Sequence, residues 1–286
     1  MSGFDLRAIS RELDEFSGAY VKKAYMPHYE QIVLRINPKE SPQFDLVLVR
    51  GARIYTSNRD RPMPMTPPPF AMVLRKHLKN ARMTKVRQLG FDRVLAFDFD
   101  TKFGERHLYV EVFRDGNIIL TDEDDVILQP LTHASYAGRT LKKGIQYQPP
   151  PQALDPHELD IEALEEMFEN SDRDLVSTLG GKANLGGTHA NAVCELAGIN
   201  PNSETKDVSS KKVLSALQCL LEDLANSREG YLMVKSSDEF DEKGLDEHIS
   251  TLEDNSIRDR FLETHANEAT PTLLPSHSEL VKMKFD

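Results

Sequence analysis

The sequence predicts an α+β fold in which a β-rich domain precedes an all-helical module. Two observations carry this prediction. β-Branched runs broken by turn residues fill most of residues 1–150, whereas apolar residues at helical spacing fill residues 151–230. The proline run at 149–151 separates the two patterns. We expect an α+β domain at 1–150, a helix–two-turn–helix module at 151–230, and a strand or hairpin with an acidic connection at 231–286.

The β-rich domain is predicted to contain two helices. The first is an amphipathic helix at 2–20, in which apolar residues recur at helical spacing: Leu6, Ile9, Leu13 and Phe16. The second is a basic helix from Phe70 to about Lys79, which follows a proline-rich loop. Strands are expected within the runs at 21–37, 44–58, 83–100, 105–124 and 127–131. The tetrapeptide RDGN at 114–117 predicts a hairpin turn, because Asp-Gly tolerates positive φ.

The module at 151–230 is predicted to be helical throughout, with helices within 155–170, 174–183, 189–199 and 209–227. In NLGGTHANAVCELAGINP, from Asn184 to Pro201, two glycines open a helix and Gly198 ends it. Backbone N–H groups at that glycine turn could bind an anion. The alternative is helix packing, with the glycines allowing close approach. The local charge favours packing, since residues 155–230 carry 6 Lys and Arg against 15 Asp and Glu.

Charge is distributed unevenly along the 286 residues. The formal net charge of −11 argues against a nucleic-acid partner, but residues 1–150 hold 23 Lys and Arg against 18 Asp and Glu, a net of +5. The positive residues gather around the second helix. They have two possible roles: a solvated face whose stems cover apolar surface, or a strip that binds RNA phosphates. The candidate RNA-backbone contacts are Arg75, Lys76, Lys79, Arg82, Lys85 and Arg87.

Asp92 and Arg93 form an acid–base pair where the chain enters a predicted strand, just after Gly90. Such a pair is ordinarily a structural salt bridge. It could also hold an RNA end or base, because arginine offers a planar fork to phosphate or a base edge while aspartate accepts from an amino group. The residues alone leave both alternatives open.

Other classes of site find no support in the sequence. The nine histidines are scattered, so we expect no metal site, and without a glycine-rich phosphate loop or a nucleophile turn we expect no cofactor and no catalytic constellation. No apolar run approaches the roughly 20 residues of a membrane helix, and the first residues lack a signal-peptide centre. A cytoplasmic protein without a membrane partner is expected.

Long blocks of the sequence resemble the N-terminal domain of the NFACT family. They are PPPFAMVLRKHLKNARMTKVRQLGFDRV (67–94), YVEVFRDGNIILTDED (109–124) and GRTLKKGIQYQPPP (138–151). The early FDLRAISREL resembles the family's opening helix, and the segment 184–201 resembles its helix–hairpin–helix region. The resemblance covers roughly residues 3–230. It implies a β-rich domain similar to the N-terminal domain of formamidopyrimidine-DNA glycosylases, followed by the helical module.

The resemblance also implies a function. Family members are ribosome-associated quality-control factors that bind the large ribosomal subunit with a stalled peptidyl-tRNA and its nascent chain. They recruit charged tRNA, and the nascent chain gains an untemplated C-terminal tail. Since the ribosome itself transfers the peptide, the implied role is not enzymatic. Position by position, the family's early aspartate falls on Asp5 and its aspartate–arginine pair for tRNA selection and tailing falls on Asp92 and Arg93. The basic helix would serve an RNA backbone on the same surface.

Two alternative functions are suggested by proteins that share this two-part arrangement or the family resemblance. A base-excision glycosylase needs an N-terminal proline amine, whereas this chain begins Met-Ser-Gly-Phe. A fibronectin- or fibrinogen-binding adhesin would need a route to the cell surface, and no secretion signal or wall anchor is visible. The coiled coil of full-length family members is absent, so we expect an N-terminal fragment. The acidic module also carries Thr188 and His189 where relatives often have a bulky apolar and an aromatic residue.

Overall fold

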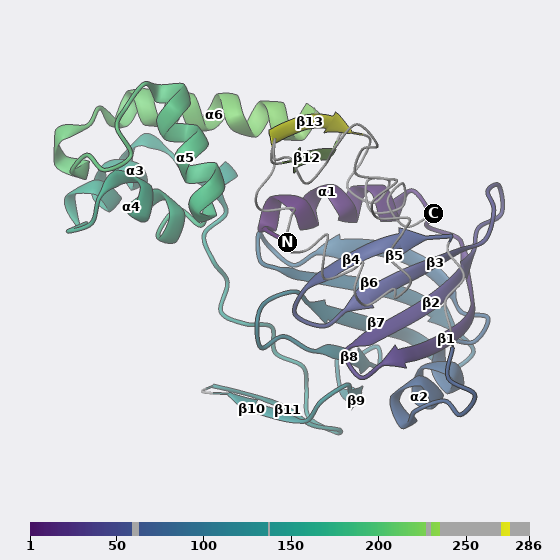
Figure 1. The fold of residues 1–286 in the computed structure, drawn as a ribbon. Coiled ribbons are helices and arrows are strands. Elements are labelled where there is room, and N and C mark those ends of the chain that lie inside the picture. The colour runs from purple at the N-terminus through teal and green to yellow at the C-terminus, as the bar shows by residue number, and fades with distance from the viewer. Residues whose placement is uncertain (59–62, 137, 227–229, 235–269, 275–286) are drawn as a thin grey trace.

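The fold is described by a computed structural model that covers residues 1–58, 63–136, 138–226, 230–234 and 270–274. It confirms the predicted α+β class. A large antiparallel sheet with two helices comes first along the chain, and a group of helices follows it (Figure 1). Among the described residues, no helix combines the length and the apolar character that a bilayer crossing requires.

One antiparallel sheet of nine strands forms the β-rich part. Its order in space is β4-β3-β2-β1-β5-β6-β7-β8-β9, so the first four strands run in reverse order and the next five in chain order. The step from β1 to β5 rests on one ladder pair, Tyr20 with Arg82. The strands are β1 (Tyr20–His28), β2 (Gln31–Asn37), β3 (Phe44–Val49), β4 (Arg53–Ser57), β5 (Arg82–Gln88), β6 (Val94–Thr101), β7 (Gly104–Glu111), β8 (Ile118–Thr121) and β9 (Ile127–Pro130).

The strands refine several sequence expectations. Each of the predicted runs 21–37 and 44–58 holds two strands that fold back on each other. The helix predicted at 2–20 was too long: it ends at Asp14, because Gly18 has a φ of +97° and β1 begins two residues later. The RDGN turn between β7 and β8 is confirmed, but for another reason than positive φ. A Cβ on Gly116 would lie 2.2 Å from the Glu111 carbonyl oxygen, so only glycine fits.

Two helices complete the core of the sheet. α1 (Gly3–Asp14) begins with a capping box in which the Ser2 N–H donates to the Asp5 carboxylate at 2.6 Å. α2 (Pro69–Leu78) is the predicted basic helix. Proline suits its first position, because an N–H there would have no hydrogen-bond partner within the helix. Their apolar faces join alternate strand residues in one buried cluster that includes Leu6, Ile9, Leu13, Phe70, Leu74, Leu78, Ile32, Leu34, Leu46, Leu48, Leu95, Phe97, Leu108 and Val110.

A second cluster lies on the other face of β6–β8, under the hairpin of β10 (Ala134–Tyr136) and β11 (Arg139–Leu141). A buried ion pair ties this hairpin to the sheet. The fully buried Glu111 carboxylate accepts from the Arg139 guanidinium at 2.5 and 3.0 Å, and from the Tyr147 hydroxyl at 3.1 Å. Burial, with Glu111 nearby, raises the pKa of Tyr147 well above its usual value, so the phenol stays protonated and donates.

The helical module follows at residues 156–226, and each predicted helix is found. Its elements are η1 (Pro156–Glu158), α3 (Ile161–Glu169), α4 (Leu175–Gly181), α5 (Gly186–Ala197), η2 (Thr205–Asp207) and α6 (Ser210–Asn226). Gly198 caps α5 at a φ of +65°, as predicted. Beyond it, β12 (Gly230–Val234) pairs with β13 (Thr270–Leu274), a partner that the sequence analysis did not identify. Most of the predicted acidic connection at 231–286 lies outside the described residues.

We predict that Arg139→Met lowers the free energy of unfolding by about 3–5 kcal/mol, because it leaves the Glu111 charge buried without its cation. Urea unfolding at neutral pH measures the change. The matched control is Arg114→Met, since Arg114 is exposed and has no ion pair among the described residues. That control should change stability by no more than about 0.5 kcal/mol. Equal losses in the two variants would contradict the structural role given to the pair.

Candidate functional site

Asp92 and Arg93 lie on the tight connection between β5 and β6. The chain turns through Gly90 at a φ of +58°, and the Asp92 N–H donates to the Leu89 carbonyl at 3.1 Å. The Asp92 carboxylate accepts from the Arg93 backbone N–H at 2.7 Å. Neither side chain forms an ion pair with any residue that the structure describes, and Arg93 is exposed. The structural salt bridge that the sequence left open is therefore not found in this part of the chain.

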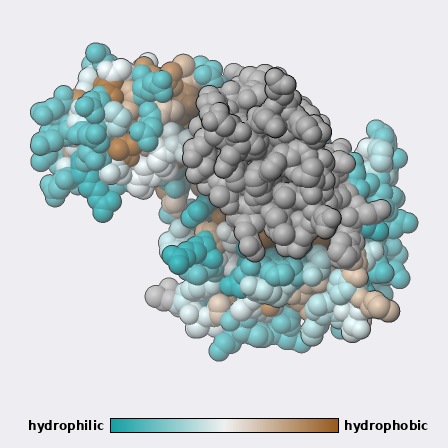
Figure 2. Space-filling view, viewed as in Figure 1, coloured by the Kyte–Doolittle hydropathy of each residue, from teal (hydrophilic) through white to brown (hydrophobic). Residues whose placement is uncertain are grey.

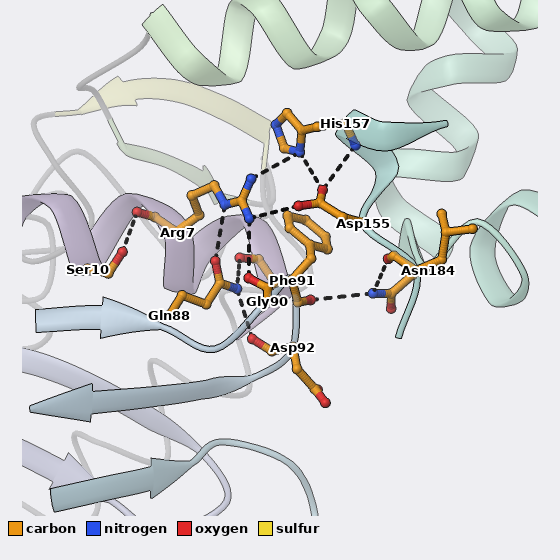
Figure 3. A network of polar contacts seen from close by, with 11 residues as sticks. Arg7, Ser10, Gln88, Gly90, Phe91, Asp92, Asp155, His157 and Asn184 are labelled. Carbon is orange, nitrogen blue, oxygen red and sulfur yellow. Dashed lines mark hydrogen bonds and ion pairs between the residues drawn. The ribbon is translucent and has the colours of Figure 1, made fainter. Parts of the chain in front are cut away.

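Arg7 of α1 holds this connection in place (Figure 3). Its Nη2 donates to the Gly90 carbonyl at 3.3 Å, and its Nε donates to the Gln88 side chain at 3.2 Å. The guanidinium also lies over the Phe91 ring, 4.8 Å from the centroid. Through these contacts one side chain fixes the backbone just before Asp92.

The same guanidinium reaches the helical module. Arg7 Nη2 lies 3.0 Å from the Asp155 carboxylate, and its Nη1 lies 3.2 Å from His157 Nδ1. Asp155 in turn contacts His157 Nδ1 at 2.7 Å and accepts from the His157 backbone N–H at 3.0 Å. Burial opposes ionisation of Asp155, but hydrogen bonds from His157 and Arg7 outweigh it and lower its pKa. The module is thereby tied to the Asp92 connection through charge.

Gln88 links the start of α1 to Asp92. Its amide nitrogen donates to the Gly3 carbonyl at 2.9 Å and to the Asp92 carbonyl at 2.8 Å. Gly3 sits so close to Phe91 that an added Cβ would lie 2.9 Å from the ring. The structure thus brings the helix start that carries Asp5 next to the Asp92 turn. The half-buried Asp5 carboxylate itself caps α1, which gives it a structural role.

An aromatic contact joins the two parts of the molecule. The Phe4 ring meets Phe91 at 4.7 Å and His189 at 4.4 Å, and both phenylalanines belong to the apolar cluster of the helical module. Asn184 adds a hydrogen bond to the Phe91 carbonyl at 3.4 Å. Burial lowers the pKa of His189. The start of α5 therefore packs on the β-rich part, which agrees with the packing alternative for the glycine turn.

The six candidate RNA-backbone cations fall into two groups. Arg75 and Arg87 are engaged within the protein: Arg75 donates to the Ala24 carbonyl at 2.7 Å, and Arg87 binds Asp98 through two bonds at 2.9 and 3.2 Å. The other four are exposed and form no ion pair within the described part of the chain: Lys76, Lys79, Arg82 and Lys85. This exposed group, here called the basic strip, is free to meet phosphates.

Most of the basic strip lies toward the end of the strands away from the Asp92 turn, with Lys85 between the two. The expectation that they share one surface stays a prediction. In the β5–β6 ladder Gln88 pairs with Leu95 near the turn, whereas Arg82 pairs with Asp100 at the far end. Six residues of strand separate these pairs by about 20 Å. α2 lies beyond the far end, away from the start of α1 (Figure 1). A single ligand would have to be extended to meet both.

Arg87 belongs to a polar cluster on the outer face of β5–β7. His107 Nδ1 lies 2.7 Å from the Asp98 carboxylate, which also holds Arg87. The hydrogen bond to Asp98 raises the pKa of His107. Burial acts to raise the pKa of Asp98, but the hydrogen bonds from His107 and Arg87 outweigh burial and lower it. Asp98, Glu105 and His107 place ligand atoms within 4.8 Å of one another. The Arg87 guanidinium already binds the Asp98 carboxylate, and its positive charge would repel a metal cation at these three residues. We therefore assign no metal site.

Sequence reasoning did not identify the supporting residues Arg7, Gln88, Asp155 and His157. Arg7 and Gln88 look like ordinary surface positions of a helix and a strand. Only the order Asp-Pro-His at 155–157 indicates a local structure, the start of a helical turn, and the Asp155 side chain does cap η1 there. Their shared role depends on contacts between residues up to 150 positions apart, and no spacing pattern reports such contacts.

We predict that Arg7→Met increases hydrogen exchange at the backbone amides of residues 89–93 and 155–158 by at least about tenfold, because both segments lose their common hydrogen-bond donor. Exchange in the β6–β7 ladder should be unchanged. Lys39→Met, on the exposed turn between β2 and β3, is the matched control. Exchange that rises in neither segment would show that Arg7 does not hold them.

The sequence matches the family described as NFACT N-terminal and middle domains over residues 2–264. The archaeal Rqc2 homolog aRqcH of Methanocaldococcus jannaschii is 32% identical over 260 residues, which cover 86% of this chain and 38% of the relative. The ribosome quality control complex subunit NEMF of Homo sapiens is 38% identical over 133 residues, covering 46% of this chain and 12% of the relative. The chain thus spans well under two thirds of either relative.

Solved structures share the fold. The N-terminal part of the fibronectin/fibrinogen-binding protein from Streptococcus suis matches with a TM-score of 0.67 and 25% identity, covering 82% of this chain and 88% of that one. The Lactococcus lactis formamidopyrimidine-DNA glycosylase matches with a TM-score of 0.40 and 13% identity, a level that carries no argument. With the family match extending over nearly the whole sequence, the chain belongs to the NFACT family.

Proposed function

We propose that this chain is the tRNA-contacting part of a ribosome-associated quality-control factor, acting in the cytoplasm on large ribosomal subunits that carry a stalled nascent chain. In this role it positions tRNA for untemplated C-terminal tailing, while the ribosome transfers the peptide. The family match and the names of the relatives, a ribosome quality control complex subunit among them, support the class of function.

The observation that carries the proposal is the state of Asp92 and Arg93. Both are charged, neither forms an ion pair with a described residue, and Arg93 is exposed on a turn that Arg7 and Gln88 hold from behind. A fixed backbone that carries charged side chains without ion pairs suits recognition, because the backbone loses little conformational entropy when a ligand binds. Arg93 would offer its fork to a phosphate or base edge, and Asp92 would orient it or accept from a base amino group.

The helical module has a different role in this proposal. Residues 155–230 carry a net charge of −9, and the outer end of the module is covered mostly by hydrophilic residues (Figure 2). The N-terminus of a helix offers only about half a positive charge, and at α5 it is turned toward Phe4 through His189. We therefore assign the module to orienting the Asp92 turn and not to gripping RNA.

The Streptococcus suis structure carries the name of a fibronectin/fibrinogen-binding protein, so an adhesin is the second candidate function. The likeness shows a common fold, and folds host many functions. Binding of tRNA and large subunits, compared with binding of fibronectin, separates the two candidates. A chain that binds fibronectin and no tRNA would support the adhesin.

We predict that Asp92→Ala and Arg93→Ala in the full-length protein each reduce tailing of stalled nascent chains by about tenfold or more, since a lost hydrogen bond to a charged group costs about 1.5–3 kcal/mol. Both variants should keep the thermal unfolding midpoint of the parent. Tail length on purified large-subunit complexes is the measurement.

Asp172 and Arg173 provide a matched control for this experiment. They form an exposed Asp-Arg pair in the same order, but in the helical module, and make no ion pair among the described residues. Asp172→Ala and Arg173→Ala should leave tailing intact. If all four variants tail alike, Asp92 and Arg93 have no special role. If the Asp92 and Arg93 variants unfold instead, their role is structural.

The basic strip generates a prediction about salt. Each strip cation that meets a phosphate should contribute about 0.9 to the slope of log affinity against log salt concentration on duplex RNA segments, and about 0.7 on single strands. Replacing Lys76, Lys79, Arg82 and Lys85 with Gln should therefore flatten the slope for tRNA. Lys211→Gln with Lys212→Gln, two exposed cations of α6, should not change it. Equal slopes in all variants would remove the strip from the interface.

A further inference from the structure

An exposed aromatic ring lies at the end of the sheet that is distant from Asp92. Phe103, on the turn between β6 and β7, keeps 42% of its surface exposed, although phenylalanine is usually buried. The His77 ring of α2 meets it at 5.4 Å. The Lys102 ammonium lies over it, 4.8 Å from the centroid. The ring is thus presented between two nitrogen-bearing side chains.

Positive charges from separate parts of the chain act on His77, the ring beside Phe103. The pKa of His77 is lowered first by burial and then by the charges of Arg106, Lys76 and Lys143, which come from β7, α2 and the segment after β11. Neither these three cations nor Lys102 forms an ion pair within the described residues. The acids beside the turn are Asp100 and Glu105, which pair across β6 and β7, and Glu123, so they balance the four cations only in part.

Two nitrogens beside the ring lack partners. His77 Nδ1 and Arg106 Nε are buried without a hydrogen-bond partner in the described part of the chain, and Arg106 is only 8% exposed. The Arg106 guanidinium is fixed, because it donates to the Phe103 carbonyl at 2.6 Å and to the Glu105 carbonyl at 2.5 Å. A fixed cation that forms no ion pair within the described residues favours an anionic ligand.

We propose that Phe103, with His77, Lys76, Lys102, Arg106 and Lys143 around it, binds an unpaired nucleotide of RNA. The base stacks on the half-exposed Phe103 ring in place of the Lys102 ammonium, and the neighbouring phosphates meet Lys102, Lys76 and Lys143. Aromatic rings flanked by cations bind single-stranded nucleic acid in this way, whatever the base. This site, here called the Phe103 platform, rests on the proposed function because it assumes an RNA ligand.

The Phe103 platform adds a second contact to that ligand. Val94 and Thr101, the two ends of β6, are seven strand steps apart, so the platform lies about 23 Å from the Asp92 turn. α2 adjoins the platform, and Lys76 belongs to both the platform and the basic strip. An RNA that spans the sheet along β5 and β6 could therefore touch the turn, the strip and the platform in succession.

The test measures affinity of the full-length protein for tRNA and for a fluorescent oligouridine of about ten nucleotides. Phe103→Ala should weaken oligouridine binding by about fivefold or more, whereas Phe103→Trp should retain it, because indole also stacks. Phe103→Leu keeps apolar volume without a ring and should behave like Phe103→Ala. Thermal unfolding of each variant should match the parent.

Tyr29 supplies the matched control. It is an aromatic residue with 67% of its surface exposed, and its ring lies 4.1 Å from that of His28, yet no lysine or arginine of the described chain lies over it. Tyr29→Ala should not change binding. Unaltered binding in both Phe103→Ala and Phe103→Leu would overturn the platform while leaving the proposed function intact. Absence of RNA binding by the parent protein would overturn both.

Discussion

The contact of the Arg7 guanidinium with three groups on two segments is the interaction on which the candidate site depends. It binds the carbonyl of Gly90, the side chain of Gln88 and the carboxylate of Asp155. The first two fix the turn that carries Asp92 and Arg93, and the third fixes the helical module. Arginine suits this position because its planar fork offers five donors in fixed directions, which lysine does not. The orientation of the module and the geometry of the turn are therefore set together.

Under the proposed function, this coupling explains how an acidic module can serve RNA binding. Residues 155–230 would repel phosphates, yet their apolar cluster receives Phe4 and Phe91 from the β-rich part. Packing of those two rings holds the module against the Asp92 turn. An anionic ligand would then be attracted to residues 1–150, which carry a net charge of +5, and not to the acidic module.

The sequence predicted local features well and long-range ones poorly. Both helices of the β-rich part and the four helices of the module follow from apolar spacing and caps, such as the αL glycine at 198. The position of Asp92 on a turn follows from Gly90. The engagement of Arg87 by Asp98 did not follow, because it depends on strand register across β5 and β6. The distance between most of the basic strip and Asp92 did not follow either, since neighbours in sequence lie at opposite ends of one strand.

Under the proposed function, tRNA meets the β-rich part at the Asp92 turn and not the helical module. The most direct measurement places a photo-crosslinking amino acid at position 93 or at position 173 of the full-length protein, bound to large subunits that carry tRNA. Both positions are exposed. We predict a crosslink to tRNA from position 93 and none from position 173. A crosslink from position 173 alone would contradict it, because tRNA would then lie on the acidic module.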